Sequence, residues 1–195
     1  MSRKSFNAGA LLAPVPPALV SCGTPEMPNV LTIGWTGIIC TKPPMTYISI
    51  RPERHSYNII KQTGEFVINL ASENLCRAVD YCGVRSGKNT DKFKDCNLTP
   101  VKSEKVSAPT VAECPVSLEC KVTEIKPLGS HDMFIAEIVN VSVKENLIDQ
   151  NERIDFSSAH LLAYSHGEYF SLGKKLGSFG YSVKKNKTKK KKSTT

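Results

Sequence analysis

This sequence has few of the features that mark the common membrane and enzyme classes. No apolar run approaches the roughly 18 residues that a membrane-spanning helix requires, so we expect no membrane partner. The four histidines form no H-E-x-x-H motif, the seven cysteines form no C-x-x-C pair, and no serine lies in a G-x-S-x-G motif. These absences argue against zinc sites and hydrolases, and we expect no metal.

Glycine motifs for nucleotide binding are also missing. The glycines of 173–180 have offsets that do not fit the dinucleotide fingerprint, and no strand–helix unit surrounds them. Residues 83–89 contain a Gly-Lys pair, but the spacing is too short for a P-loop, and Asn89 stands where Ser or Thr is needed. A Rossmann enzyme and a P-loop NTPase are therefore both disfavoured.

The cysteines are odd in number, and we recognise no export signal before them. Arg3 and Lys4 precede only a short apolar run, which Pro14, Pro16 and Pro17 interrupt. Such cysteines are typical of reduced thiols in a reducing compartment, several of them buried as small apolar residues. We therefore expect a cytoplasmic protein.

The net charge of +8 is concentrated at one end of the chain. The last twelve residues contain seven lysines and no acidic residue, which leaves about +1 for the remainder. Charge runs of this kind are typically solvated and disordered, so we expect one folded domain over residues 1–182 and a Lys-rich, disordered tail over 183–195. We expect no specific nucleic-acid partner, the alternative being a weak, salt-sensitive association of the tail with nucleic acid or acidic surfaces.

Strand-like segments are many and helical ones few. Segments rich in Val, Ile, Thr, Phe and Tyr predict strands over residues 10–22, 29–41, 45–51, 65–71, 115–126 and 132–144, with a hairpin connection at 127–132. Helices are predicted from Ser56, as N-cap, to Gly64, over 72–82 and over 89–95, while 157–167 is ambiguous between helix and strand. This pattern predicts a mainly β fold, a closed or nearly closed antiparallel β-barrel with peripheral helices.

The segment from Asn29 to Ser56 indicates a binding site. It holds two β-patterned stretches joined by a Thr-Lys-Pro-Pro turn, and it ends in Arg51, Arg54 and His55, where a helix is expected to begin. A helix N-terminus offers free backbone N–H groups and a positive dipole end, and arginine can bind phosphate through two hydrogen bonds. The segment therefore predicts a site for a flat organic ring with a phosphate tail.

A second basic segment, residues 80–93, offers Ser86, Gly87 and Lys92 as a further wall of such a site. Each feature also has a simpler interpretation. The serine at the helix start can be only a cap, the two arginines can be solvated charges at a strand end, and the single tryptophan, Trp35, can be a core aromatic. The joint placement of these features favours the binding site.

Short pieces between about Pro14 and Gly180 form a pattern whose order and spacing are specific. They include P-x-P at 14–16, LVS at 19–21, NVLT-x-x-W at 29–35, CTKPP at 40–44, SIR at 49–51, DYCG at 80–83, SG-x-x-x-DKF at 86–93, LEC at 118–120 and H-x-x-FI-x-E at 131–137. Together they resemble the flavin reductase-like, FMN-binding split-barrel proteins, and within them the flavoredoxin-like branch.

The resemblance implies a split β-barrel, a homodimer and FMN bound without a covalent bond. By position it implies that the flavin ring lies along Thr32, Ile33, Gly34 and Trp35, that the ribityl phosphate lies along Ser49, Ile50, Arg51, Arg54, His55, Ser56 and Tyr57, and that Ser86, Gly87 and Lys92 complete the phosphate site. His131 matches a position that could help to place a nicotinamide or another donor. The electron chemistry would belong to the flavin, so no catalytic side chain is expected.

Two functions stay open under this resemblance. The first is an enzyme that transfers electrons from NAD(P)H to flavin or another acceptor. The second is a flavoredoxin-type carrier between protein partners, with little NAD(P)H turnover. Because a Rossmann site is missing, a nicotinamide donor would have to lie across the flavin in an open groove.

Overall fold

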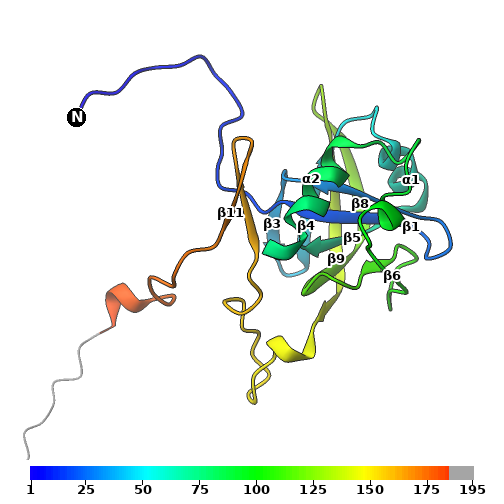
Figure 1. Cartoon of the computed structure of the whole chain (residues 1–195). Coiled ribbons are helices and arrows are strands. Elements are labelled where there is room, and N and C mark those ends of the chain that lie inside the picture. Colours follow the sequence, from blue (N-terminus) through cyan, green and yellow to red (C-terminus); the bar gives the residue numbers. More distant parts are fainter. Residues whose placement is uncertain (185–195) are drawn as a thin grey trace, which may run out of the picture.

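The structure is a computed structural model that describes residues 1–184. Its centre is one antiparallel sheet in the order β2-β1-β5-β8-β9-β4-β3. The strands are β1 (Ala18–Gly23), β2 (Pro28–Ile33), β3 (Thr36–Thr41), β4 (Pro44–Ile50), β5 (Glu65–Leu70), β8 (Val116–Pro127) and β9 (Asp132–Val143). Figure 1 shows this sheet curled into a barrel with helices on its outside. The mainly β, split-barrel class predicted from the sequence is confirmed.

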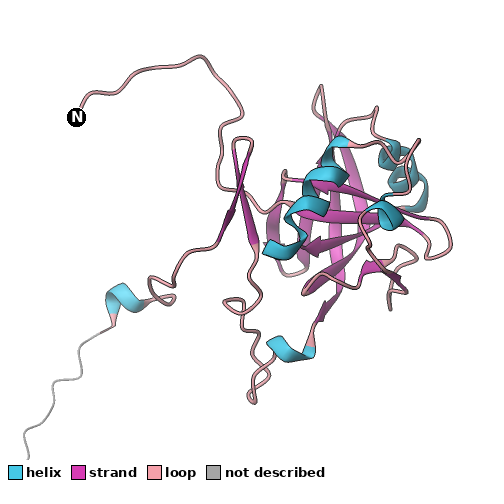
Figure 2. Cartoon of the chain, viewed as in Figure 1, coloured by secondary structure: helices cyan, strands magenta, loops and turns pink. Residues whose placement is uncertain are grey.

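The remaining elements are short. The helices are α1 (His55–Thr63), α2 (Cys76–Val84) and α3 (Lys92–Asp95), with 3₁₀ turns η1 (Glu73–Leu75), η2 (Glu145–Leu147) and η3 (Tyr181–Val183). Two small hairpins, β6 (Pro100–Val101) with β7 (Thr110–Val111) and β10 (Leu162–Ser165) with β11 (Glu168–Ser171), complete the described chain. Figure 2 shows the β10–β11 hairpin standing beside the barrel. None of the helices within residues 1–184 is long and apolar enough to cross a membrane.

The predicted strand over 29–41 is in fact two strands at opposite edges of the sheet. β2 ends at Ile33 and pairs with β1, whereas β3 begins at Thr36 and pairs with β4. The connection Gly34–Trp35 therefore takes the chain from one edge of the sheet to the other. Strand patterning runs through both pieces without a break, so local sequence concealed the crossing. This crossing brings the two edges of the curled sheet together.

Other predicted boundaries also change. The first strand begins at Ala18 instead of residue 10, because the three prolines before it provide no N–H for a ladder. The ambiguous segment 157–167 contains strand β10. The predicted helix 72–82 consists of η1 followed by α2, which ends two residues later at Val84, and the predicted helix 89–95 shortens to α3. The 127–132 hairpin is confirmed by the pairing of β8 with β9. The predicted tail over 183–195 lies outside the described residues from 185 onward.

Two apolar clusters bury the two faces of the central strands. Side chains that alternate along β1, Ala18, Val20 and Cys22, face the barrel interior with Phe66 and Phe134. The intervening Leu19 packs outside the barrel in a second cluster with α2 and Phe93. β1 is thus buried on both faces, which explains its nearly uniform apolar sequence.

Candidate functional site

Two adjoining pockets lie where the barrel edges meet. We call the first the aromatic pocket. It has a volume of about 340 Å³ and is lined by Pro17, Leu31, Thr32, Ile33, Gly34, Trp35, Ser49, Ile50, Arg51, Arg54, Asp80, Gly83, Val84, His131, Tyr164 and Tyr169. The second, the basic pocket, has a volume of about 360 Å³ and is lined by Leu31, Arg51, Glu53, Arg54, His55, Ser56, Arg85, Ser86, Gly87 and Lys92. Leu31, Arg51 and Arg54 line both, so the pockets form one bipartite site.

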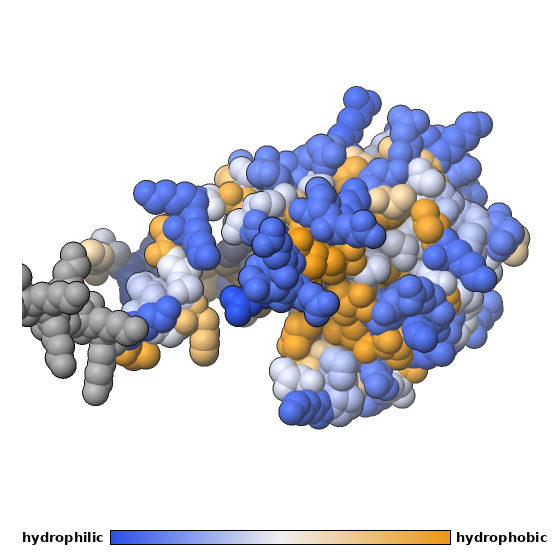
Figure 3. All heavy atoms as spheres, turned by 90° about the horizontal axis from the view of Figure 1, so that it is seen from below, coloured by the Kyte–Doolittle hydropathy of each residue, from blue (hydrophilic) through white to orange (hydrophobic). Residues whose placement is uncertain are grey.

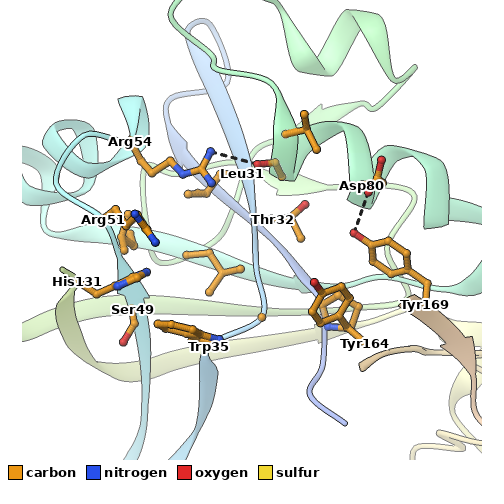
Figure 4. A pocket seen from close by; sticks show the side chains of 16 residues that line it. Leu31, Thr32, Trp35, Ser49, Arg51, Arg54, Asp80, His131, Tyr164 and Tyr169 are labelled. Carbon is orange, nitrogen blue, oxygen red and sulfur yellow. Dashed lines mark hydrogen bonds between the residues drawn. The ribbon is translucent and has the colours of Figure 1, made fainter. Parts of the chain in front are cut away.

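The predicted residues converge here because two strands end at the same place. Figure 4 shows Thr32 and Trp35 at the end of β2, with Ser49 and Arg51 at the end of β4. The backbone N–H of Ser49 donates to the carbonyl oxygen of Trp35 at 3.0 Å, which joins the strand ends across the crossing segment. The chain then turns from Arg51 into α1. The sheet edge and the helix start therefore form adjacent walls.

Trp35 and His131 stack at the mouth of the aromatic pocket. Their ring centroids are 4.5 Å apart and the rings are tilted by 39°. Trp35 is 47% exposed, so the alternative of a plain core aromatic is wrong. The pKa of His131 lies below its ordinary value, first because the ring is partly shielded from water and then because Arg51 and Arg54 are positive. The imidazole is therefore neutral at neutral pH, and its Nδ1 lies 3.0 Å from the Ser130 hydroxyl.

The opposite wall of the aromatic pocket was not predicted from the sequence. Tyr164 and Tyr169 come from the β10–β11 hairpin, with ring centroids 5.2 Å apart. The Tyr169 hydroxyl donates to Asp80 of α2 at 3.3 Å, as Figure 4 shows. Burial, followed by the Asp80 charge, raises the pKa of Tyr169 to about 12, which keeps this phenol protonated. The only local signal was Tyr164 in the ambiguous segment 157–167, with Tyr169 shortly after it.

In the basic pocket, Ser56 does not have the role predicted for it as a helix cap. α1 begins at His55, and Arg54 occupies the N-cap position without a side-chain capping bond. Ser56 lies in the first helical turn, where it is only 2% exposed. Its Oγ accepts a hydrogen bond from Asn29 Nδ2 at 2.6 Å. The first N–H groups of α1, at His55 and Ser56, lack partners within the helix, and both residues line this pocket.

Lys92 is the buried cation of this pocket. The residue is 5% exposed, and its Nζ donates to the Cys82 carbonyl oxygen at 2.9 Å. Burial lowers the pKa of Lys92, and the positive charge of Arg54 contributes in the same direction. An ammonium group carries three N–H donors, so this lysine can hydrogen-bond an anion in the pocket without losing Cys82.

A turn closes the basic pocket on the other side. The Ser86 carbonyl accepts a bond from the Thr90 hydroxyl at 2.8 Å, and the Ser86 hydroxyl accepts one from the Lys88 N–H at 3.3 Å. A Cβ added to Gly87 would lie 2.0 Å from Asn29 Oδ1 and 3.2 Å from the His55 ring. Only glycine allows the backbone to approach the α1 start so closely.

Tyr57 and Arg51 differ from the other predicted positions. Tyr57 lines neither pocket. Its side chain is 7% exposed and packs edge-on to Phe134, with ring centroids 5.3 Å apart, and its hydroxyl donates to Asp132 at 2.5 Å. It faces the core because it lies on the inner side of α1.

Arg51 does lie at the site but is also paired with Glu53 at 3.6 Å, with both side chains more than half exposed. The pair itself therefore contributes little stability.

The two pockets differ in chemistry. The aromatic pocket is lined by ring and aliphatic side chains, with Arg51, Arg54 and Asp80 among them. The basic pocket combines four cationic side chains and His55 with hydroxyls and a helix N-terminus, against one carboxylate, Glu53. The arrangement can hold a flat ring in one part and an anion in the other.

Comparisons with known proteins agree with this geometry. Residues 11–173 match the flavin reductase like domain. A flavoredoxin of Desulfovibrio vulgaris (Miyazaki F) superposes with a TM-score of 0.86 at 32% identity, over 94% of this chain and 100% of that one. A protein with a split barrel domain from Shewanella frigidimarina NCIMB 400 superposes at 0.77, with 26% identity over 86% of both chains. An uncharacterized protein of Archaeoglobus fulgidus is 32% identical over 80% of this chain and 88% of its own length.

Proposed function

This chain belongs to the flavin reductase like domain family, and from that membership we propose that it is a flavoprotein that binds FMN and transfers electrons from NAD(P)H to flavin or another acceptor. The observation that carries the proposal is the bipartite site. An aromatic pocket suited to a flat ring shares Leu31, Arg51 and Arg54 with a basic pocket suited to a phosphate. A phosphorylated aromatic cofactor has both a flat ring and a phosphate, so it would use both pockets.

The basic pocket fits the FMN phosphate. Lys92 would supply a buried ammonium group, Arg51 and Arg54 would supply guanidinium donors, and the start of α1 would supply the N–H groups of His55 and Ser56. Ser86 and Gly87 would close the site through the turn before α3. The close approach at Gly87, which a Cβ would block, supports a cradle for a compact anion.

The aromatic pocket fits the ring. Thr32, Ile33, Gly34 and Trp35 would hold it at the end of β2, and Ser49 and Ile50 would contact the ribityl chain. Tyr57 is withdrawn from the proposed contacts because its side chain lies in the core. The neutral imidazole of His131, stacked on Trp35, would position the electron donor without adding charge.

Bound FMN would supply the redox chemistry, the uptake and release of one or two electrons. The chain's own residues would bind and orient the cofactor, and the cationic residues of the basic pocket would hold the phosphate end fixed while the ring stays reachable through the open side. The partly exposed Trp35 and the exposed Val84 mark that open side.

A carrier between protein partners is the second candidate. It is supported by the 32% identity to the Desulfovibrio vulgaris flavoredoxin across 94% of this chain. On this candidate the donor would be a protein, and NAD(P)H would reduce the flavin poorly.

We also propose a homodimer in the cytoplasm, built from one folded domain over residues 1–182; the Lys-rich tail predicted over 183–195 lies outside the described residues from 185 onward. Segments 1–14 and 172–184 extend away from the barrel in Figure 1 and expose Leu12, Leu176 and Phe179. Figure 3 shows a hydrophobic area flanked by hydrophilic residues on one face of the folded body. A second copy could cover such surfaces. Light scattering after size exclusion would test the dimer.

The seven free cysteines support the proposed cytoplasmic location, because thiols stay reduced in a reducing compartment.

The first experiment tests cofactor binding. Purified protein incubated with FMN and then desalted should stay yellow, and Arg51→Ala and Ser56→Ala should each weaken FMN binding by roughly 1–3 kcal/mol if they remove a charge-assisted contact. Protein that stays colourless under all loading conditions would contradict both candidate functions.

The second experiment separates the two candidates. FMN-loaded protein is mixed anaerobically with NADH or NADPH, and the visible flavin absorbance is followed by stopped flow. Rapid bleaching supports the enzyme. Bleaching only by a reduced protein donor supports the carrier.

A further inference from the structure

We infer that Asn29, which lines neither pocket, is a positioning residue that fixes the Ser56 hydroxyl as a donor to a phosphate monoester and so makes the site select FMN over unphosphorylated riboflavin. The inference rests on the proposed function and deepens it, because it assigns the choice between two flavins to a residue outside the cofactor's contact shell.

The contact itself is short and well shielded. Asn29 on β2 donates from Nδ2 to Ser56 Oγ at 2.6 Å, and Ser56 is 2% exposed. The same amide lies 3.5 Å from the thiol of Cys22, its partner across β1 and β2. The Cys22 thiol also borders the Ser56 hydroxyl, and burial raises the pKa of Cys22 to about 11, so it stays an uncharged, weak acceptor.

The direction of this bond decides the chemistry. An amide NH₂ group can only donate, so Ser56 Oγ must be the acceptor, and its own proton must point elsewhere. Within residues 1–184, the Cys22 thiol is the acceptor that the structure gives this hydroxyl, and a thiol is a weak one. A phosphate oxygen in the basic pocket is a far stronger acceptor, because O–H···O⁻ bonds are charge-assisted and short. Asn29 therefore leaves Ser56 with a hydroxyl ready to donate to an anion.

The opposite side of Asn29 is closed by the turn before α3. A Cβ on Gly87 would lie 2.0 Å from Asn29 Oδ1, so the carbonyl end of the amide faces the Gly87 backbone while the NH₂ end faces Ser56. β2, α1 and the turn thus meet at this amide, whose NH₂ end bonds to Ser56 and whose carbonyl end lies next to Gly87.

The test compares affinities for FMN and riboflavin in the same variants, using quenching of the single tryptophan or calorimetry. Asn29→Asp replaces the donor by an acceptor and adds a negative charge, so Kd for FMN should rise about tenfold or more while Kd for riboflavin stays within about twofold. Asn29→Ala only frees the hydroxyl, and the selectivity ratio, Kd for riboflavin divided by Kd for FMN, should fall about threefold. Asn58→Asp is the matched control, because it makes the same change on the exposed side of α1; its ratio should stay near that of the unmodified protein.

The outcomes are distinct. A selective loss of FMN affinity in both Asn29 variants supports the inference, and Asn29→Ala carries the test alone if Asn29→Asp does not fold. An unchanged ratio, or a parallel loss of both flavins as expected for a merely structural residue, overturns it. An unmodified protein that binds FMN no better than riboflavin also overturns it, whereas one that binds neither flavin contradicts the proposed function itself.

Discussion

Lys92 donates from its Nζ to the carbonyl oxygen of Cys82 at 2.9 Å, so the start of α3 is tied to the last turn of α2 through a buried ammonium group. Burying a charge in this way is costly unless it is hydrogen-bonded or paired. One carbonyl bond leaves two of its three N–H groups for a ligand. An anion bound in the basic pocket would pair with the Lys92 ammonium group and so offset the cost of burying its charge.

Lys92→Met should weaken FMN binding about tenfold or more, because the variant keeps an unbranched side chain and removes the buried charge. Lys88→Met is the control, since Lys88 is exposed in the same turn and does not line either pocket. Equilibrium titration with FMN measures both. Equal affinities for the two variants would remove Lys92 from the phosphate site.

The same lysine predicts a pH dependence. Its folded pKa lies below the ordinary 10.5 because of burial. Between the lowered pKa and 10.5 the unfolded chain binds more protons, so this group makes the ligand-free protein more stable as pH rises through that window. FMN binding should show the opposite trend, weakening as Lys92 loses its proton. Affinities measured from about pH 7 to about pH 10 should fall in the unmodified protein and stay flatter in Lys92→Met.

Gly87→Ala should weaken FMN binding without unfolding the protein. The new Cβ would lie 2.0 Å from Asn29 Oδ1, so the amide or the turn must shift, and the Asn29–Ser56 bond would lengthen. Gly173→Ala provides the control, because its Cβ would meet no atom within 4 Å. FMN titration and a thermal melt on each variant make the check. An unchanged FMN affinity in Gly87→Ala would contradict this prediction and would mean that the turn can move to accommodate the new Cβ.

Tyr57→Phe should lower stability and leave FMN affinity unchanged. The substitution removes the donor to Asp132, a carboxylate only 9% exposed. Leaving a buried acceptor without its partner costs roughly 1–3 kcal/mol, which is a fall of several degrees in Tm for a chain of this size. Tyr47→Phe serves for comparison, since that side chain is only partly buried. A weaker affinity for FMN in folded Tyr57→Phe would return Tyr57 to the site.

Trp35 fluorescence should report the titration of His131. The chain has one tryptophan, and its ring centroid is 4.5 Å from that of His131. The pKa of His131 lies below 6.5, first through burial and then through Arg51 and Arg54. Acidification of the ligand-free protein should change the emission with a midpoint below pH 6.5, and His131→Leu should abolish the transition. His166→Leu should retain it, because His166 lies on the exposed β10–β11 turn.

Most of the strands could be predicted because their signals are local. Alternation and β-branched residues predicted the ends of β4, β5, β8 and β9 to within one residue. The crossing at Gly34–Trp35 could not be predicted in this way. An alternating pattern says which side chains share a face, but it does not say which neighbour the strand pairs with, and β2 and β3 pair at opposite edges.

The site residues also fall into those that could be predicted from the sequence and those that could not. Residues close in sequence, such as Arg51, Arg54 and Ser56, could be found together because a strand end meets a helix start. Tyr57 was included because the family resemblance covers its position, whereas the helix turns its side chain into the core. Tyr164 and Tyr169 were missed because they reach the aromatic pocket from a hairpin far along the chain.

The sequence by itself determined the mainly β class, the family, and the kind of site, because strand patterning, a helix start and the order of short motifs are all encoded locally. Only the tertiary structure decided which groups share a cavity and in which direction they hydrogen-bond. Lys92 becomes a buried cation, and Asn29 a donor to Ser56, only when β2, α1 and the turn before α3 pack together. Burial and hydrogen-bond direction are properties of that packing, and no stretch of sequence contains them alone.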